Sequence, residues 1–127
     1  MLGLELITIL ALIEYAVLAL MVGSARARFG VAAPATTGDP TFERYFRVQQ
    51  NTLEALIIFL PSFWIFAQRV SSWGAVILGV IFIAARAEYA RGYIMAPEGR
   101  SRGAQLTFAA NGILLIGSLL GLIVHAL

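Results

Sequence analysis

The sequence contains no cysteine and no lysine, and only 13% of its residues are charged. Without cysteine the chain forms no disulfide, offers no thiolate to a metal and has no cysteine nucleophile, so any thiol chemistry must come from a substrate. The single histidine, His125, lies near the C-terminus, where a frayed tail is the simplest interpretation, and we expect no metal site. The formal net charge of +2 argues against a nucleic-acid partner.

Apolar segments take up most of the chain. Hydrophobic residues make up 60% of the sequence and the mean hydropathy is +0.85, which is more apolar than a soluble domain of this length can hide in one core. A spanning helix needs about 20 apolar residues. Such stretches occur at about residues 2–22, 53–70, 73–95 and 106–127. We predict an all-α integral membrane four-helix bundle in which residues 1–127 form a single domain.

Arginine supplies all nine basic residues, and it is unevenly distributed. Only Arg69 lies beside the second connection between apolar stretches. The first and third connections are flanked by Arg26, Arg28, Arg44 and Arg47, and by Arg91, Arg100 and Arg102, respectively. By the positive-inside rule, loops 1 and 3 are cytoplasmic and both termini lie outside. The first stretch carries Glu5 and Glu14 with no basic residue ahead of it, unlike a cleaved signal, and no targeting extension is visible, so we expect a bacterial inner membrane protein.

Turn and capping residues mark the ends of the predicted helices. Residues 30–38 (GVAAPATTG) read as an irregular loop, and Asp39-Pro40 supplies an N-cap and a first-turn proline for the second helix. This helix can run over residues 40–69, which is roughly 45 Å and longer than the hydrocarbon core. Pro61 is expected to kink it. Pro97-Glu98-Gly99 ends the third helix, so the fourth begins near Arg100.

Polar residues form a stripe on the second helix. Arg44, Arg47, Asn51 and Glu54 recur at spacings of three and four, which places them on one face. A charge in the centre of a membrane costs about 2.5–3.5 kcal/mol on insertion scales and normally faces a bundle interior or a cavity. Two readings remain open: the stripe lines a binding site, or it forms an interhelical cluster of salt bridges and hydrogen bonds.

The third helix offers a matching face, because Arg86, Tyr89 and Tyr93 also recur at spacings of three and four. The tyrosines can alternatively belong to an aromatic belt at the membrane interface. Glu88 and Arg91 fall on the other side and are expected to form an ion pair. The two faces together offer arginines for carboxylates, a carboxylate for an ammonium group, and phenol and amide groups for peptide bonds, which suits a small zwitterionic peptide.

Polar and small residues also occur in the first and fourth helices. Glu14 lies in the middle of the first apolar stretch, and either a functional role or an ion pair with an arginine of another helix would account for it. Gly117 and Gly121 have the GxxxG spacing that is typical of a close contact between helices.

Two long motifs resemble one membrane protein family. Residues 36–54 (TTGDPTFERYFRVQQNTLE) and residues 85–93 (ARAEYARGY) are similar to the signatures of the MAPEG family, the membrane-associated proteins of eicosanoid and glutathione metabolism. The resemblance covers most of the chain. It implies a homotrimer of four-helix protomers that bind glutathione, as a co-substrate, between neighbouring protomers near the cytoplasmic face.

The resemblance also implies roles for individual residues. The matching positions for glutathione binding are Arg47, Asn51, Glu54, Tyr89 and Tyr93 within one protomer, and Arg26 and Gln49 reaching from the neighbouring protomer. Arg100 falls where a leukotriene-forming member of the family has an arginine proposed to hold the glutathione thiolate, with Arg102 as the alternative. This chain departs from that member at two positions. Where this chain has Ala55, that member has a tyrosine contact, and where this chain has Ala27, that member has a second catalytic arginine.

The expected activity follows from this resemblance. A thiol with a pKa near 8.5 is mostly protonated at neutral pH, and both a guanidinium and a helix N-terminus favour the thiolate. We expect a glutathione transferase, with possible peroxidase activity, that acts on apolar, lipid-like electrophiles in the membrane. The rivals are a lipid-binding or lipid-presenting protein of the same fold without catalysis, and an assembly protein in which the polar stripes only join helices.

Overall fold

The computed structural model describes the backbone of residues 1–127 and every side chain except that of Pro97. Within this described part, the regular structure is entirely helical, which confirms the predicted all-α class. The elements are α1 (Leu2–Phe29), α2 (Pro40–Arg69), α3 (Ser72–Met95), the short 3-10 helix η1 (Pro97–Arg100) and α4 (Ser101–Ala126). All four α-helices in the described residues are long and apolar enough to cross a membrane.

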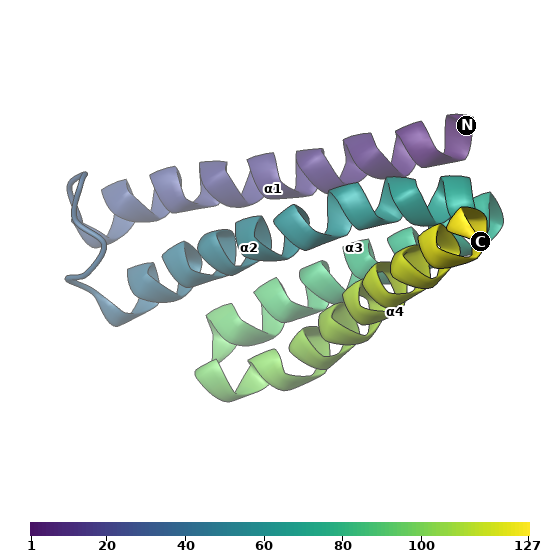
Figure 1. The fold of residues 1–127 in the computed structure, drawn as a ribbon. Helices are drawn as coiled ribbons and strands as arrows, with labels where there is room; N and C mark the ends of the chain where they lie inside the picture. The colour runs from purple at the N-terminus through teal and green to yellow at the C-terminus, as the bar shows by residue number, and fades with distance from the viewer.

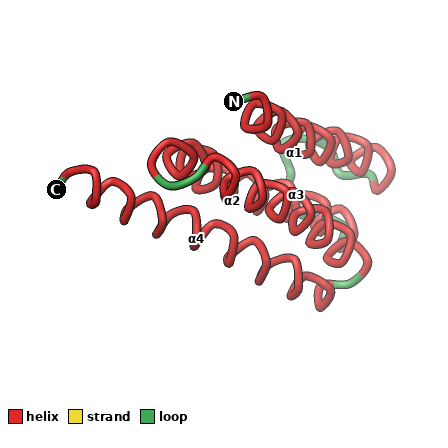
Figure 2. Tube along the Cα trace, turned by 90° about the vertical axis from the view of Figure 1, so that its right-hand side faces the viewer, coloured by secondary structure: helices red, strands yellow, loops and turns green.

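Successive helices run in opposite directions, so the two chain termini lie at one end of the bundle (Figure 1). The loop over residues 31–39 and the η1 turn lie at the other end. Figure 2 shows α1 and α4 on opposite sides of the α2 and α3 pair. The two arginine-flanked connections therefore lie at the same end, as the sequence predicted.

The start of α2 confirms the predicted cap. Oδ1 of Asp39 accepts the backbone N–H groups of Thr41 and Phe42, both at 2.9 Å, which satisfies two donors of the first turn. The helix then continues through Pro61 to Arg69. Its 30 residues span about 45 Å, so at least one end extends beyond a hydrocarbon core of about 30 Å.

Helix α1 is longer than the apolar stretch predicted for it. The stretch ends at residue 22, whereas α1 runs to Phe29 and ends at Gly30, which adopts a left-handed conformation with φ 70°. Arg26 and Arg28 lie in its last turn, where a positive charge is favoured by the helix dipole. Hydropathy marks only the apolar part of a helix, so its polar extension toward the membrane surface was not predicted.

Aromatic packing fixes α2 against α3. The rings of Phe59 and Phe82 stack with centroids 3.9 Å apart, and Phe63 stacks on Phe59 at 5.1 Å. All three side chains are fully buried, together with Leu114 from α4. An aromatic pair contributes about 0.5–1.5 kcal/mol beyond its burial. This cluster holds the middle of the bundle and leaves its two ends to other contacts.

Glycines bring the backbones of α3, η1 and α4 into contact. A Cβ atom on Gly92 or on Gly99 would overlap the carbonyl group of the other glycine, and a Cβ on Gly103 would overlap the backbone of Tyr89. Only glycine permits such an approach. These contacts fix the start of α4, including Arg100, against the end of α3.

The predicted close contact of the GxxxG glycines is confirmed. Gly117 packs against the ring of Phe66, and Gly121 packs against Arg69 and Val70. Both contacts join α4 to the end of α2 that lies near the chain termini.

Candidate functional site

A polar pocket of about 350 Å³ lies between α2, α3 and the start of α4. The structure brings together in it six of the residues singled out from the sequence. Its lining residues are Arg47, Gln50, Asn51, Glu54, Tyr89, Tyr93, Arg100 and Ala104. Residues from four different elements, α2, α3, η1 and α4, thus converge on one cavity. Of the lining residues, Gln50 and Ala104 were not predicted.

The charged side chains of this pocket have no ionic partner within the described residues. Arg47, Glu54 and Arg100 are all exposed. Among the described side chains, the ion pair that forms is Arg91 with Glu88, at 2.9 Å, as predicted. The alternative of an interhelical cluster holds for its hydrogen bonds, since Arg44 donates to the carbonyls of Ile94 and Met95 on α3 and Asn51 accepts from Arg86, but no described residue forms a salt bridge with the stripe. Both signs of charge remain available to a ligand or to a second chain.

Two stacked tyrosines form one wall of the pocket. The rings of Tyr89 and Tyr93 lie 5.6 Å apart at an interplanar angle of 30°. Tyr89 is only 6% exposed, so it is not a lipid-facing residue of an aromatic belt. The guanidinium carbon of Arg100 lies 5.9 Å from the Tyr93 ring centroid. The wall thus supports the guanidinium through a cation–π contact.

Arg86 lies behind the pocket's tyrosine wall and is 1% exposed. The sequence suggested that it would face a ligand with the two tyrosines; it is instead absent from the described lining of the polar pocket and borders the apolar groove that adjoins it. Its Nη2 donates to Thr52 Oγ1 and to Asn51 Oδ1, each at 2.8 Å, and its Nη1 donates to Thr107 Oγ1 at 3.3 Å. Its guanidinium carbon lies 4.3 Å from the centroid of the Tyr89 ring. Arg86 is therefore an internal link between α2, α3 and α4.

This network orients Asn51. Because Arg86 can only donate, the side-chain oxygen of Asn51 must face it, and the side-chain amide nitrogen is left to donate elsewhere. Asn51 also lines the polar pocket. A buried arginine thus presents a hydrogen-bond donor of Asn51 to whatever the pocket holds.

Arg100 is the last residue of η1 and the N-cap residue of α4. The N–H groups of a first helical turn and the helix dipole both favour an anion at such a place. The α4 start has no side-chain cap among the described residues, and its first turn has no acidic residue. Arg102, the alternative to Arg100, is absent from the described lining of the pocket. Of these two arginines, Arg100 is therefore the one that lines the pocket.

Arg26 and Gln49 are absent from the described lining of the polar pocket. Nη1 of Arg26 donates to the carbonyl of Ala35 at 2.7 Å, and its guanidinium carbon lies 5.0 Å from the Phe42 ring centroid. Nε2 of Gln49 donates to the hydroxyl of Tyr15 at 3.4 Å. Both side chains thus have contacts within their own chain.

Glu14 has no ionic partner among the described residues. It lies in the middle of α1, and its Oε1 is buried without a hydrogen bond. An ion pair with an arginine of another helix was one expectation, and no such pair forms between the described side chains.

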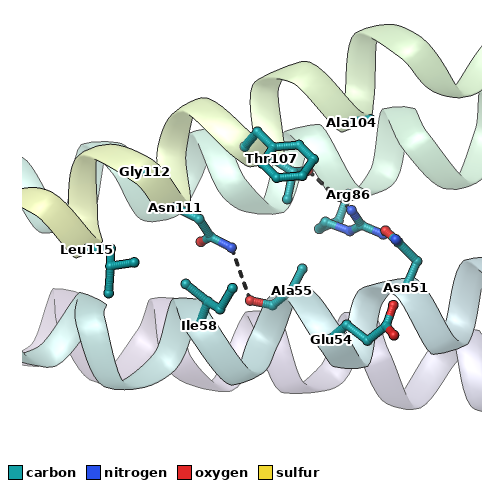
Figure 3. A pocket seen from close by; sticks show the side chains of 11 residues that line it. Asn51, Glu54, Ala55, Ile58, Arg86, Ala104, Thr107, Asn111, Gly112 and Leu115 are labelled. Carbon is teal, nitrogen blue, oxygen red and sulfur yellow. Dashed lines mark hydrogen bonds between the residues drawn. The ribbon is translucent and has the colours of Figure 1, made fainter.

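An apolar groove of about 390 Å³ adjoins the polar pocket (Figure 3). It shares Asn51, Glu54 and Ala104 with the pocket. It then follows α2 and α4 away from the charged end. The remaining lining residues are Ala55, Ile58, Arg86, Thr107, Phe108, Asn111, Gly112 and Leu115. A polar, charged site therefore opens directly into an apolar one. Two molecules, one bound in each site, would meet near Ala104.

Among the residues that the structure describes, no group of three or more histidine, cysteine, aspartate or glutamate side chains could hold a metal ion.

Known proteins resemble this chain over nearly its whole length. The sequence model of the MAPEG family matches residues 4–120. The chain is 48% identical over 118 residues to the uncharacterized protein sll1147 of Synechocystis, covering 93% of this chain and 86% of that one. It is 38% identical over 115 residues to human microsomal glutathione S-transferase 2, covering 91% and 76%. It is 34% identical over 121 residues to rat leukotriene C4 synthase, covering 95% and 81%.

Proposed function

The chain belongs to the MAPEG family of integral membrane proteins, and we propose that it is a membrane-embedded glutathione transferase that conjugates glutathione to apolar electrophiles. One observation carries this proposal. A pocket with both signs of charge, which have no partner among the described residues of the chain, opens into an apolar groove. A transferase that joins a zwitterionic peptide to an apolar molecule needs such a pair of adjoining sites.

The polar pocket supplies a complementary group for each part of glutathione. Arg47 would pair with a carboxylate and Glu54 with the ammonium group. The amide nitrogen of Asn51, set by Arg86, would donate to a peptide carbonyl. Tyr89 and Tyr93 would supply hydroxyl groups and a flat wall. Binding would order exposed side chains and place the thiol beside Arg100.

Arg100 would then be the catalytic residue. Its guanidinium, together with the N-terminus of α4, would favour the thiolate over the thiol. The sulfur would form a bond to the electrophilic carbon while the bond to the leaving group breaks, and the leaving group would depart with its electron pair. A fall of about two units in the thiol pKa corresponds to roughly 2.7 kcal/mol, a reasonable demand on one partly desolvated arginine.

The assembly belongs to the same proposal. We expect a homotrimer in which Arg26 and Gln49 of one protomer approach the polar pocket of the next. The exposed charges Arg47 and Glu54 are consistent with a site completed by a second chain. Native mass spectrometry from detergent should detect trimers, and a spectrum of monomers alone would contradict this assembly.

We also propose that the polar pocket opens toward the cytoplasm of a bacterial inner membrane, with both termini outside. The chain lacks cysteine, so single cysteines can report topology. A cysteine at Thr37 should react with an impermeant reagent only from the cytoplasmic side, and one at Ser72 only from outside. The reverse pattern would overturn the orientation.

Titration with glutathione tests the function and its rival. We expect the detergent-solubilised protein to bind glutathione by calorimetry and to conjugate it to a chlorodinitrobenzene-type electrophile. The rival, a lipid-binding protein without catalysis, draws its support from the size of the apolar groove. It predicts binding of lipid without binding of glutathione, and an assembly protein predicts binding of neither.

A further inference from the structure

The apolar groove contains one buried polar side chain that its apolar character does not explain. Asn111 lies on α4 among the lining residues and is 7% exposed. Its Nδ2 donates to the backbone carbonyl of Ala55 on α2 at 3.1 Å. Its Oδ1 is buried and has no hydrogen-bond partner among the described residues.

The orientation of this amide is fixed by chemistry. The carbonyl of Ala55 can only accept a hydrogen bond, so the nitrogen of Asn111 must face it and the oxygen must face elsewhere. Figure 3 shows the nitrogen on the side of Ala55, to which it donates, and the oxygen on the side of Leu115. A buried acceptor without a partner is costly and calls for a donor. The hydrogen bond that joins α2 to α4 uses only the amide nitrogen of Asn111, so it does not explain the oxygen.

Ser118 provides a comparison seven residues, or about two turns, further along α4. It is also buried, and its Oγ donates to the carbonyl of Ser62 on α2 at 2.9 Å. It joins the same two helices as Asn111, yet it is not among the described residues that line the groove. A hydroxyl group such as that of Ser118 is therefore enough to join α2 to α4, and the amide oxygen of Asn111 is not needed for that purpose. Asn111 differs because it lines the groove and carries a buried acceptor with no partner among the described residues.

We propose that Asn111 determines specificity by accepting a hydrogen bond from an O–H group on the apolar second substrate. This rests on the proposed function, because the substrate's reacting end would lie beside the thiol in the polar pocket. Along α4, Asn111 lies about 10 Å from Ala104 and about 16 Å from Arg100. The substrate class is therefore a long apolar chain with an electrophilic carbon at one end and a hydroxyl group about 10–16 Å away. Because the groove is continuous with the polar pocket, one substrate molecule can carry both the electrophilic carbon and the hydroxyl group.

Binding of unreactive probes tests the inference without turnover. The probes are a series of long-chain alcohols and their methyl ethers, which cannot donate, titrated into the wild-type protein and two variants at one detergent concentration. We expect the wild type to prefer the alcohol by roughly 2- to 10-fold. Asn111→Leu should lose this preference, and Ser118→Ala, which removes a comparable interhelical bond outside the groove, should keep it.

The decisive quantity is the ratio between alcohol and ether, because partitioning into detergent affects all three proteins equally. Equal affinities for alcohol and ether in the wild type would overturn the inference, as would a preference that survives in Asn111→Leu. Binding of neither probe would also overturn it, since another occupant such as a second chain would then cover the oxygen. Equal loss of the preference in Ser118→Ala would show that helix packing, not recognition, is responsible.

Turnover separates this inference from the proposed function. With glutathione and an alkyl iodide bearing a terminal hydroxyl, the sulfur–carbon bond forms as iodide leaves with the electron pair. We expect a kcat/KM several-fold above that of the methoxy counterpart in the wild type, and equal values in Asn111→Leu. If the alcohol preference holds in binding but no conjugate forms, the groove recognises hydroxylated chains and the transferase proposal fails. If conjugates form without a preference, the transferase stands and the role of Asn111 fails.

Discussion

Two arginines, Arg86 and Arg100, lie on either side of the stacked tyrosines and have opposite surroundings. Arg86 is buried and donates to Asn51, Thr52 and Thr107, whereas Arg100 is exposed and contacts only an aromatic ring in the described part of the chain. A buried cation needs its hydrogen bonds satisfied within the fold. The contrast separates a structural arginine from one that is available to a ligand.

The same contrast divides the carboxylates at this end of the molecule. Glu88 pairs with Arg91 on the face away from the pocket, and Glu54 lines the pocket without an ionic partner among the described residues. The pairs that the chain completes by itself contribute to its structure. The charges that it leaves without partners mark the place where a ligand, or a neighbouring protomer, completes the arrangement.

The first expected effect is on stability. Arg86→Met should lower the free energy of unfolding by about 2–4 kcal/mol, because it leaves Thr52, Asn51 and Thr107 without their donor. Thermal unfolding in detergent measures it. Because Arg100 is exposed, the free energy of unfolding of Arg100→Met should stay within about 0.5 kcal/mol of the wild-type value. Equal losses in the two variants would remove the distinction between the arginines.

The next effect concerns glutathione affinity. Arg47→Ala and Glu54→Gln should each weaken binding by about 2–5 kcal/mol, since each leaves one partner of a desolvated charge pair alone. Glu88→Gln is the matched control, because it removes a carboxylate whose partner, Arg91, lies on the same helix. Calorimetry gives the three affinities. Equal weakening in all three variants would mean that the ligand does not occupy this pocket.

Much of the fold could be predicted because its signals are local. Apolar stretches gave the helices, and Asp39 with Pro40 gave the start of α2 to the residue. The extension of α1 to Phe29 could not be predicted from hydropathy, because a helix continues past the membrane core through polar turns. The packing of α4 against α2 was only partly visible, through the spacing of Gly117 and Gly121.

The sequence predicted on which helix face each site residue lies, but not how deeply its side chain is buried. Spacings of three and four placed Arg47, Asn51 and Glu54 correctly on one pocket wall. The same spacing grouped Arg86 with the tyrosines, and periodicity cannot say that its side chain turns inward to be buried. Burial depends on the approach of α4, which the sequence of α3 does not contain.

The glycine contacts that position Arg100 were missed, although a signal was present. Gly99 and Gly103 are four residues apart, the same spacing that was noticed at the other end of α4. Asn111 was also passed over, although a lone amide within an apolar stretch is a default candidate for function. Neither signal can be interpreted from the sequence alone, because its meaning depends on which neighbouring helix the residue faces.

The smallest predicted effect tests Arg100 itself. Arg100→Ala should leave glutathione binding largely intact while lowering turnover, because its proposed role is to hold the thiolate and not the peptide. Removing the guanidinium removes a favourable interaction with the negative form, so the pKa of the bound thiol should rise by about two units, or about 2.7 kcal/mol. The thiolate's ultraviolet absorbance, followed as pH is raised, reports the shift directly.

Arg102→Ala is the matched control, because Arg102 lies two residues further along the chain and outside the described lining of the pocket. It should change the thiol pKa less than Arg100→Ala does. If Arg102→Ala abolishes the thiolate signal and Arg100→Ala does not, the thiol lies on the other side of the α4 start and the pocket is assigned wrongly. If neither variant matters and the wild type shows no thiolate at neutral pH, the transferase loses its chemical basis. The apolar groove would then support the lipid-binding alternative, and Arg100, like Arg86, would have only a structural role.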